Sequence, residues 1–499
     1  MKLQEVLKDI DILESKGSLD VEVKDLGSDS RNLAKNGLFF AIKGFTLDGT
    51  QFIAGAKENG AVAVVVESDF EMSNCLDGLT YVKVENIRKT LALASKNFYG
   101  DPSSKLKVIG VTGTKGKTTS TFMIKSILEA SGKKVGLIGS IAVYIGDKEL
   151  EVTDRTTPES FVIYKYLAKM VEENVDIVVL EVSSQAMVLD RVTGIKFDCV
   201  LFTNLTEDHI SPKEHKDMED YFSAKLSLAK KAPYVVTTLD NEYTARLPKL
   251  IDGKIKTFGL SDKNEITAKD LKPTNSSTTF TLVEDGEETE VTVSIPGDYM
   301  IANALGAIGI AEFMGAKKED IREGLKNVSV FGRSEMVSNN LGLTIMIDYA
   351  HTPSSLESIL KTVKPYTKGR VICVWGVGGD RDAKKRPIMG EISGKYADYT
   401  VLTSDQVRTE EPIKILREIE SGLKPVNNQY SVIVNRTEGI RFALNMANED
   451  DMIVIPGLGN DLYIEQDRIK HYYDERKVIA KLIDEILEKE KKVGYEYEF

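Results

Sequence analysis

The feature that most constrains the fold of this 499-residue chain is a glycine-rich loop, GVTGTKGKTTS, at residues 110–120. An apolar strand candidate, KVIGVT, leads into the loop, and an amphipathic helix pattern, TSTFMIKSILEASG, follows it. A strand, a glycine-rich turn and a helix in this order predict a parallel α/β sheet. Backbone N–H groups of such a turn, together with the positive end of the helix, bind phosphate. The spacing departs from G-x-x-x-x-G-K-[ST], because Val111 stands five positions before Gly116.

The rest of the chain continues the alternation of strands and helices. A prior of about 150 residues per domain predicts roughly three domains for this length. A break rich in Gly, Pro and Ser, YGDPSSKLK, separates a small N-terminal α/β segment from the loop. We therefore predict an α/β protein with an N-terminal α/β domain at 1–102, a central, mainly parallel P-loop domain at 103–334 and a C-terminal Rossmann-like domain at 335–499. Period-two alternation within 264–296 predicts an antiparallel hairpin or an edge extension of the sheet.

The charge balance limits the partners of this protein. Sixty-five Lys and Arg residues against 77 Asp and Glu residues give a net charge of −12, which opposes binding to nucleic acid or anionic membranes. The N-terminus lacks the apolar core of a secretory signal, and no apolar run reaches membrane-spanning length. The three cysteines are far apart, as is typical of buried thiols in a reducing cytosol. We expect a cytoplasmic monomer that binds neither nucleic acid nor a membrane.

Side chains of the loop suit a nucleotide and its metal ion. Lys117 can reach the terminal phosphates, and the Thr118 hydroxyl can bind Mg²⁺. Motor ATPases, GTPase-like switches, kinases and ligases all use such a loop, so other polar clusters must discriminate among them. Those clusters are Thr156 and Thr157 in TTPES, Glu181 and Ser183 at the end of DIVVLEV, Asp208 and His209 after CVLFTNL, and Lys225 on a helix. Together, Glu181 and His209 predict a second hard-cation site near the loop.

The combined motifs resemble the Mur ligase family. The segments TGTKGKTT, TTPES, EVSSQA with Arg191, FTNL..DH and Y..AK carry the resemblance. SDSR at 28–31, DYAHTPSSLE at 348–357 and GGDRDAKKRP at 378–387 extend it over nearly the whole chain. Within the family the chain is most similar to the MurE type, the UDP-N-acetylmuramoyl-L-alanyl-D-glutamate ligases that add the third residue of the peptidoglycan stem.

This resemblance implies a reaction for the chain. A Mur ligase phosphorylates a carboxylate with ATP, and an amine then attacks the acyl phosphate, so that an amide forms and ADP and phosphate are released. The resemblance therefore implies an ATP-dependent acid–amino-acid ligase of peptidoglycan precursor synthesis, with UDP-N-acetylmuramoyl dipeptide and a free diamino acid as partners. The N-terminal domain would bind the uridine nucleotide.

The resemblance also assigns roles to individual residues. ATP would contact Gly113, Thr114, Lys115, Gly116, Lys117, Thr118, Thr119, Asn303, Arg333 and Asp348. One Mg²⁺ would bind Thr118 and Glu181, and a second would bind His209 and a CO₂-derived carbamate on Lys225. Lys117, Glu181, His209 and Lys225 would form the catalytic set. The UDP-linked substrate would contact Ser30, Thr156, Thr157, Ser183 and Arg191.

The identity of the added amino acid is less constrained. By the resemblance, Arg381 would bind the α-carboxylate of this amino acid. The side chain would be bound by two segments, TSDQVRTEEP and IPGLGNDLY, the second of which contains Gly457. Diaminopimelate enzymes carry the motifs DNPR and GKGHE at these two places. Arg408 can clasp a distal carboxylate, as in meso-diaminopimelate, unless Glu410 and Glu411 hold it.

Other residues point toward a distal ammonium. Asp405 and Asp461 can receive it, and HISPKEHKDMEDY resembles lysine-adding members. These features favour lysine slightly over diaminopimelate, with ornithine third. Three alternative functions stay open. A folylpolyglutamate synthase is disfavoured because such enzymes lack SDSR, and a nucleotide-gated binding protein is disfavoured because it has no need of Glu181 with Lys225. The third is a Mur-like paralogue of another pathway.

Overall fold

The computed structural model describes residues 1–44, 47–153, 155–211 and 214–496. The chain divides into two compact units, Met1–Ile266 with Leu305–Asp320 and Thr267–Ala304 with Ile321–Phe499. Both units combine helices with mainly parallel sheets, which confirms the predicted α/β class. The two boundaries between the three predicted domains stay a prediction. Within the described residues, no helix is both long and apolar enough to cross a membrane.

The first unit begins with a five-stranded sheet of order β1-β5-β4-β3-β2. Its strands are β1 (Glu14–Lys16), β2 (Asp25–Gly27), β3 (Gly37–Phe40), β4 (Ala61–Glu67) and β5 (Thr80–Val84). Only β1 runs antiparallel to its neighbour among these described strands. The sheet has helices on both faces: α1 (Leu3–Val6) and α3 (Ile87–Phe98) pack on one, and α2 (Ile53–Glu58) packs on the other.

An eight-stranded sheet follows in the same unit, with the order β13-β12-β11-β6-β10-β7-β8-β9. Its strands are β6 (Lys107–Thr112), β7 (Val135–Ile138), β8 (Ala142–Ile145), β9 (Lys148–Val152), β10 (Ile177–Glu181), β11 (Cys199–Phe202), β12 (Tyr234–Thr237) and β13 (Lys254–Thr257). From β13 to β7 the neighbours are parallel, as the sequence predicts, whereas β8 and β9 are antiparallel additions.

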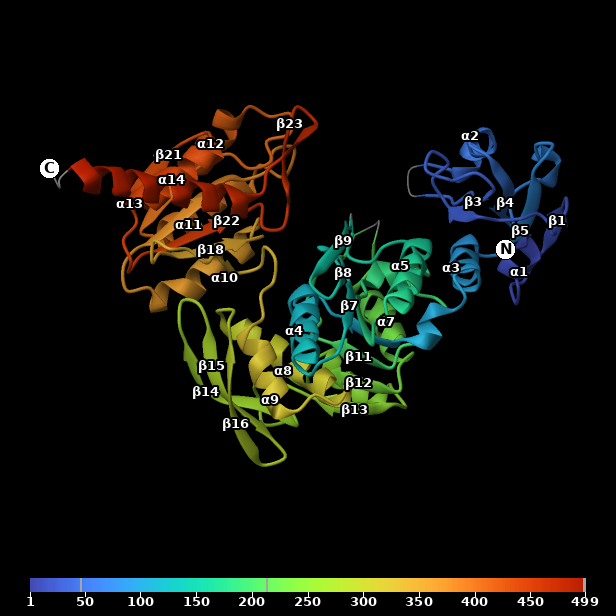
Figure 1. The fold of residues 1–499 in the computed structure, drawn as a ribbon, viewed down its shortest axis with the longest axis horizontal. Helices are drawn as coiled ribbons and strands as arrows, with labels where there is room; N and C mark the ends of the chain where they lie inside the picture. The colour runs from blue at the N-terminus through green and yellow to red at the C-terminus, as the bar shows by residue number, and fades with distance from the viewer. Residues whose placement is uncertain (45–46, 154, 212–213, 497–499) are drawn as a thin grey trace. The chain divides into compact units, whose positions relative to one another are not determined.

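Helices cover both faces of this sheet (Figure 1). Helices α5 (Ser160–Glu172), α6 (Ser184–Val188) and α7 (Met218–Ala229) share one apolar core around Tyr164, Phe197 and Phe222. Helix α4 (Lys117–Ala130) packs against β6, β7 and β10 from the opposite face. Because β6 lies between β10 and β11, the residues that follow these three strands meet at one edge of the sheet.

The second unit contains a three-stranded sheet and a six-stranded sheet. Strands β14 (Ile266–Pro273), β15 (Thr278–Glu284) and β16 (Glu287–Val293) form the small sheet, in which β15 and β16 are antiparallel. This pairing confirms the hairpin that alternation predicted. Helices α8 (Asp298–Phe313) and α9 (Lys318–Lys326) follow in the chain. Short 3-10 turns elsewhere lie at Gly49–Phe52, Met72–Asn74, Pro102–Lys105, Thr244–Lys249 and Lys364–Tyr366.

The six-stranded sheet has the order β17-β18-β22-β19-β20-β21 and is parallel apart from β17. Its strands are β17 (Glu335–Met336), β18 (Thr344–Asp348), β19 (Val371–Trp375), β20 (Tyr399–Leu402), β21 (Tyr430–Val432) and β22 (Met452–Pro456). The last five of these confirm the predicted Rossmann-like alternation. A hairpin of β23 (Tyr463–Gln466) and β24 (Ile469–Tyr472) precedes the last helix.

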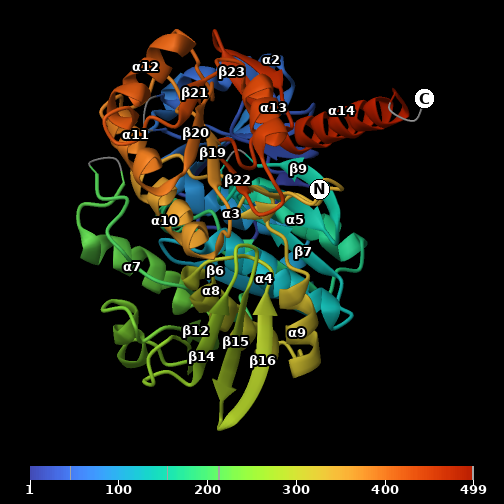
Figure 2. The ribbon, with the colours of Figure 1, turned by 90° about the vertical axis from the view of Figure 1, so that its left-hand side faces the viewer.

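Figure 2 shows this sheet between two helical layers. One layer contains α10 (Pro353–Val363), α11 (Lys385–Tyr396) and α12 (Pro412–Leu423), and the other contains α13 (Arg436–Met446) and α14 (Glu475–Glu496). Both strand faces are therefore apolar, as is typical of doubly wound sheets. The loops after β18, β19, β20 and β22 emerge at the carboxyl edge of the sheet.

Candidate active site

The glycine-rich loop lies between β6 and α4 and is fastened to the end of β11. Gly113 has a φ of +144°, and a Cβ on it would lie 1.9 Å from Thr203 Oγ1, so only glycine fits there. Asn204 accepts a hydrogen bond from the Lys115 N–H at 3.0 Å and donates one to the Lys115 carbonyl at 3.0 Å. These contacts hold the loop against the end of β11.

Two lysine side chains converge beneath this loop. Lys117 Nζ donates to the Gly113 carbonyl at 2.9 Å and to the Thr114 carbonyl at 3.0 Å. Lys225 Nζ also donates to the Gly113 carbonyl at 2.9 Å, and this lysine is 1% exposed. Burial, and then the nearby positive charge of Lys117, lower the pKa of Lys225 well below its usual range. The amine of Lys225 is thus biased toward its neutral, nucleophilic form.

Glu181 is a fully buried carboxylate at the end of β10. It accepts hydrogen bonds from Thr118 Oγ1 at 3.1 Å, from the Ser140 hydroxyl at 3.0 Å and from the Ser140 N–H at 3.0 Å. Burial raises the pKa of Glu181, and these donors act against that shift. Ser140 also donates to Thr156 Oγ1 at 3.1 Å. The sequence analysis missed Ser140, although its position just after β7 was a usable signal.

Thr157 joins the TTPES segment to the end of β10. Its hydroxyl donates to the Glu181 carbonyl at 2.9 Å and accepts from the Ser183 N–H at 3.0 Å. Arg191 donates to the Thr157 carbonyl at 3.1 Å and forms an ion pair with Glu159 at 2.9 Å. These five residues therefore form one polar cluster. Four of them are site residues named from the sequence, whose binding roles stay predictions, and Glu159 is not.

Two further predicted residues, His209 and Ser30, contact other described residues than those of the polar cluster. The His209 ring nitrogen Nδ1 is 2.9 Å from Glu214 Oε1, and its ring centroid is 5.7 Å from that of Tyr221. The Tyr221 hydroxyl is 3.1 Å from Thr114 Oγ1, so Tyr221 connects His209 to the loop. Ser30 is buried after β2, and its carbonyl accepts from Asn59 at 2.7 Å. The metal role of His209 stays a prediction.

The other predicted nucleotide residues belong to the second unit. Asp348 ends β18 and accepts a hydrogen bond from the Ser334 N–H at 2.6 Å. Loss of solvent around this carboxyl raises its pKa. The Arg333 guanidinium stacks over the Tyr349 ring at 4.7 Å. Asn303 is buried on α8. The predicted ATP contacts are thus divided between the two units.

The loops after β20 and β22 bring two acidic side chains together. Gln406 Nε2 donates to Asp461 Oδ2 at 2.5 Å, and Asp405 is buried beside them. Partial burial, and then the negative charge of Asp405, raise the pKa of Asp461 to about 6. Gly457 has a φ of +127°, and a Cβ there would lie 2.3 Å from Asp405 Oδ2. Arg381 is exposed on the loop after β19.

Arg408 lies in the same loop as Asp405. It donates to the Gly379 carbonyl at 2.5 Å and pairs with Glu465 of β23 at 3.5 Å. Glu410 instead pairs with Arg386 at 2.7 Å. Arg408 is therefore paired with an acidic residue, as one sequence-based alternative has it, but the partner is Glu465; Glu410, which that alternative named, binds the buried Arg386 instead.

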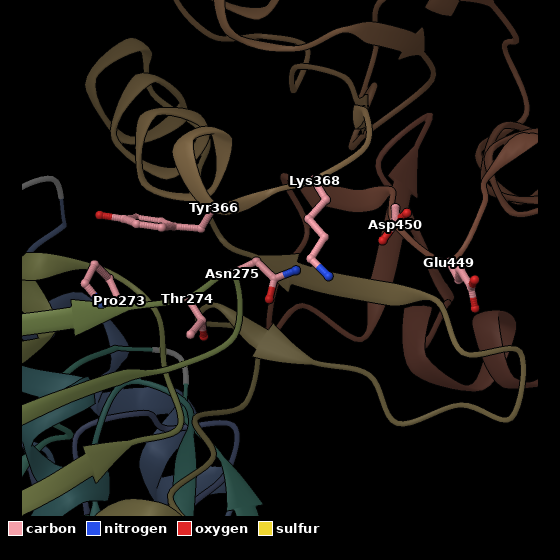
Figure 3. Close-up of a pocket in the computed structure, with 7 residues that line it drawn as sticks. All are labelled: Pro273, Thr274, Asn275, Tyr366, Lys368, Glu449 and Asp450. Atoms are coloured by element: carbon pink, nitrogen blue, oxygen red, sulfur yellow. The ribbon is translucent and has the colours of Figure 1, made fainter.

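A separate cavity of about 400 Å³ lies within the second unit (Figure 3). The segment 273–275 lines it on one side, and Tyr366, Lys368, Glu449 and Asp450 line the other. None of these described lining residues belongs to the motifs above, so this cavity is distinct from the candidate site.

Comparison with known proteins identifies the family of the chain. Three family models match consecutive parts of the chain: "Mur ligase family, catalytic domain" at residues 22–99, "Mur ligase middle domain" at 111–311 and "Mur ligase, glutamate ligase domain" at 332–459. The UDP-N-acetylmuramoyl-L-alanyl-D-glutamate–2,6-diaminopimelate ligase of Clostridium tetani is 44% identical over 490 residues, covering 97% of this chain and all of that protein. The ligase of the same name from Clostridioides difficile is 38% identical, covering 96% of this chain and 98% of that protein.

Solved structures give the same result. A 2,6-diaminopimelate ligase structure superposes with a TM-score of 0.70 at 25% identity, covering 97% of this chain and 99% of that one. The Mycobacterium tuberculosis folylpolyglutamate synthase complexed with ADP shares the fold with a TM-score of 0.60 at 18% identity, covering 74% of this chain and 91% of that one. The chain therefore belongs to the Mur ligase family of ATP-dependent, amide-forming enzymes. The names of its curated relatives confirm the predicted likeness to the MurE type.

Proposed function

We propose that this protein adds meso-diaminopimelate to UDP-N-acetylmuramoyl-L-alanyl-D-glutamate in the cytoplasm, as a step of peptidoglycan precursor synthesis. The relatives' names favour this amino acid over lysine, which the sequence ranked slightly ahead. The chain's own support is the composition of the loops after β20 and β22. Asp405 and Asp461 offer negative charge, and Arg408 offers positive charge nearby.

That pairing of charges suits one diamino acid better than the others. The distal carbon of diaminopimelate carries both an ammonium and a carboxylate, whereas lysine and ornithine end in an ammonium alone. A site built only for lysine would gain nothing from a cation near the acidic pair, because like charges repel. The position of Arg408 beside Gly379 is therefore the observation that carries the choice of amino acid.

For the first half-reaction, the phosphate loop and Lys117 would bind the β- and γ-phosphates of ATP. Backbone N–H groups, the start of α4 and the Lys117 ammonium would face the charge that develops on the phosphoryl oxygens. The Thr118 hydroxyl and the Glu181 carboxylate are hard oxygen donors in contact with each other, which fits Mg²⁺. Mg²⁺ bound there would supply further charge neutralisation. Ser140 and Thr157 would keep the segment around Glu181 in position.

Lys225 fits the predicted carbamate. A buried lysine whose pKa is lowered can attack CO₂ with its neutral amine, forming an N–C bond and releasing a proton. The product is a carboxylate in place of a cation, next to the Lys117 ammonium. That change would remove repulsion between Lys225 and Lys117 and create an oxygen ligand for a second Mg²⁺.

The rival functions have weaker support. The folylpolyglutamate synthase covers 74% of this chain, compared with 97% for the diaminopimelate ligase structure. A nucleotide-gated binding protein has no need of a buried Lys225 beside the loop. A Mur-like paralogue of another pathway would differ in its substrate, so substrate assays separate it from the proposed function.

The decisive experiment is a substrate panel. Phosphate release with ATP, Mg²⁺ and UDP-N-acetylmuramoyl-L-alanyl-D-glutamate is measured with meso-diaminopimelate, L-lysine, L-ornithine or no amino acid. We expect the highest kcat/KM with meso-diaminopimelate. A clear preference for lysine would reverse the choice of amino acid, and no turnover with any diamino acid would contradict the reaction itself.

A further inference from the structure

The second unit contains a buried ion pair beneath the loops after β20 and β22, which are called the amino-acid loops from here on. Arg436 is the first residue of α13 and Glu475 is the first residue of α14. Arg436 Nε donates to Glu475 Oε1 at 2.6 Å, and the two side chains are 1% and 0% exposed. Burying a charged pair costs solvation free energy, so the stability of the fold does not by itself explain why such a pair is present. Its other contacts indicate what it does.

The guanidinium of Arg436 reaches the backbone of two separate loops. It donates to the Ser404 carbonyl, just after β20, at 3.3 Å and to the Pro456 carbonyl, at the end of β22, at 3.3 Å. Strand β19 lies between β20 and β22 in the sheet, so one side chain joins loops that are not hydrogen-bonded neighbours. The spacing of the two loops therefore depends on Arg436.

The same guanidinium also faces Asp405, one of the two acidic side chains in these loops. Its Nη1 atom lies 4.0 Å from Asp405 Oδ2, and a Cβ on Gly457 would lie 3.7 Å from its Nη2 atom. Burial opposes the charged form of Arg436, but the carboxylates of Glu475 and Asp405 outweigh it, and the pKa of Arg436 is raised. Arg436 therefore stays positive and compensates part of the negative charge of Asp405.

We propose that Arg436, held by Glu475, is a positioning residue that sets the spacing of the loops after β20 and β22 for binding of the incoming amino acid. It acts through Asp405 and the backbone of both loops. This inference rests on the proposed function, because those loops are taken to bind the diamino acid. Arg436 would affect the KM for the amino acid far more than the phosphoryl-transfer step.

A control for Arg436 exists at the opposite edge of the same sheet. Arg370, just before β19, pairs with the buried Asp451, just before β22, at 2.7 Å. It also donates to the carbonyl of Met446, the last residue of α13, at 2.7 Å. Arg370 thus links α13 and β22, two elements that Arg436 also links, to the start of β19 at the amino edge of the sheet, away from the loops.

The experiment compares Arg436→Lys, Glu475→Gln and Arg370→Lys in the full-length enzyme. Lysine keeps the charge of Arg436 but cannot bind Glu475 and both carbonyls at once. We expect Arg436→Lys to raise the KM for meso-diaminopimelate at least tenfold. The KM for ATP and the rate of ADP–ATP phosphate exchange, with the UDP-linked substrate and no amino acid, should change less than threefold. Arg370→Lys should leave all of these values within threefold.

Several results would overturn the proposal. An unchanged amino-acid KM in Arg436→Lys would do so, as would equal effects of Arg436→Lys and Arg370→Lys, which indicate general destabilisation. If Arg436→Lys does not fold, Glu475→Gln provides the test, because its amide oxygen can still accept from Arg436; we expect a severalfold rise in the same KM. If wild type prefers another amino acid, the proposed substrate fails, and the KM comparison is made with the preferred one.

Discussion

Two candidate binding regions, one in each compact unit, lie at the carboxyl edges of parallel sheets, yet they are built differently. The phosphate loop between β6 and α4 is formed by adjacent residues, and its contacts to Asn204 and Thr203 only fasten it. The amino-acid loops after β20 and β22 come from distant segments, and the buried Arg436 joins them. A motif of adjacent residues can therefore be recognised in the sequence, whereas the loops after β20 and β22 are joined by contacts between distant segments.

The largest effect should come from the phosphate loop. Lys117→Ala removes a cation from the phosphoryl-transfer site, and we expect ADP formation to slow by about 100-fold or more. Lys134→Ala, beyond the end of α4, is the control and should retain wild-type activity. Near wild-type activity in Lys117→Ala would contradict the assignment of the loop.

The second prediction concerns the proposed carbamate on Lys225, the buried lysine beside the phosphate loop. Lys225→Ala should be nearly inactive, and acetate should restore part of its activity by supplying the missing carboxylate near the metal. Lys225→Arg should stay inactive with acetate, because the guanidinium keeps a positive charge there. Turnover is measured with and without acetate, and a fully active Lys225→Ala enzyme would exclude the modification as a requirement.

The Arg408→Ala variant tests which amino acid the loops after β20 and β22 select. Truncating one partner of a buried charge pair costs about 2 to 5 kcal/mol, so Arg408→Ala should lower kcat/KM for meso-diaminopimelate by more than tenfold. Activity with lysine should stay within threefold, since lysine has no distal carboxylate. Arg417→Ala, exposed on α12, is the control. Equal activity of wild type and Arg408→Ala with meso-diaminopimelate would mean that Arg408 binds no substrate carboxylate.

The smallest effect concerns pH. Asp461, with a pKa of about 6, is ionised at pH 7 and largely protonated at pH 5.5, so it binds a distal ammonium less well as the pH falls. The KM for the diamino acid should rise about fourfold over this interval through loss of the ionised form. In Asp461→Asn the KM should be higher at pH 7 and nearly constant with pH. A wild-type KM that does not change would rule out Asp461 as an ammonium ligand.

Much of the candidate site around the phosphate loop could be predicted from the sequence, because its residues stand at the ends of strands. Glu181 and the phosphate loop follow adjacent parallel strands, and an apolar run followed by polar residues reveals such an edge. Ser140 was missed although it stands two residues after β7, because only its contact with Glu181 in the folded chain distinguishes it from other serines at strand ends. The partner of Arg408 was also missed, since Glu465 lies on a hairpin 57 residues later, whereas Glu410 is only two residues away.

The sequence by itself determined the α/β class, the order of the strands along the chain, the phosphate loop and the membership of the family. These features depend on local periodicity and on motifs of adjacent residues. Only the tertiary structure decided which charges pair: Arg386 with Glu410, Arg408 with Glu465, and Arg436 with Glu475. Opposite charges attract at any sequence separation, so the partner of a buried arginine is set by strand order and helix packing.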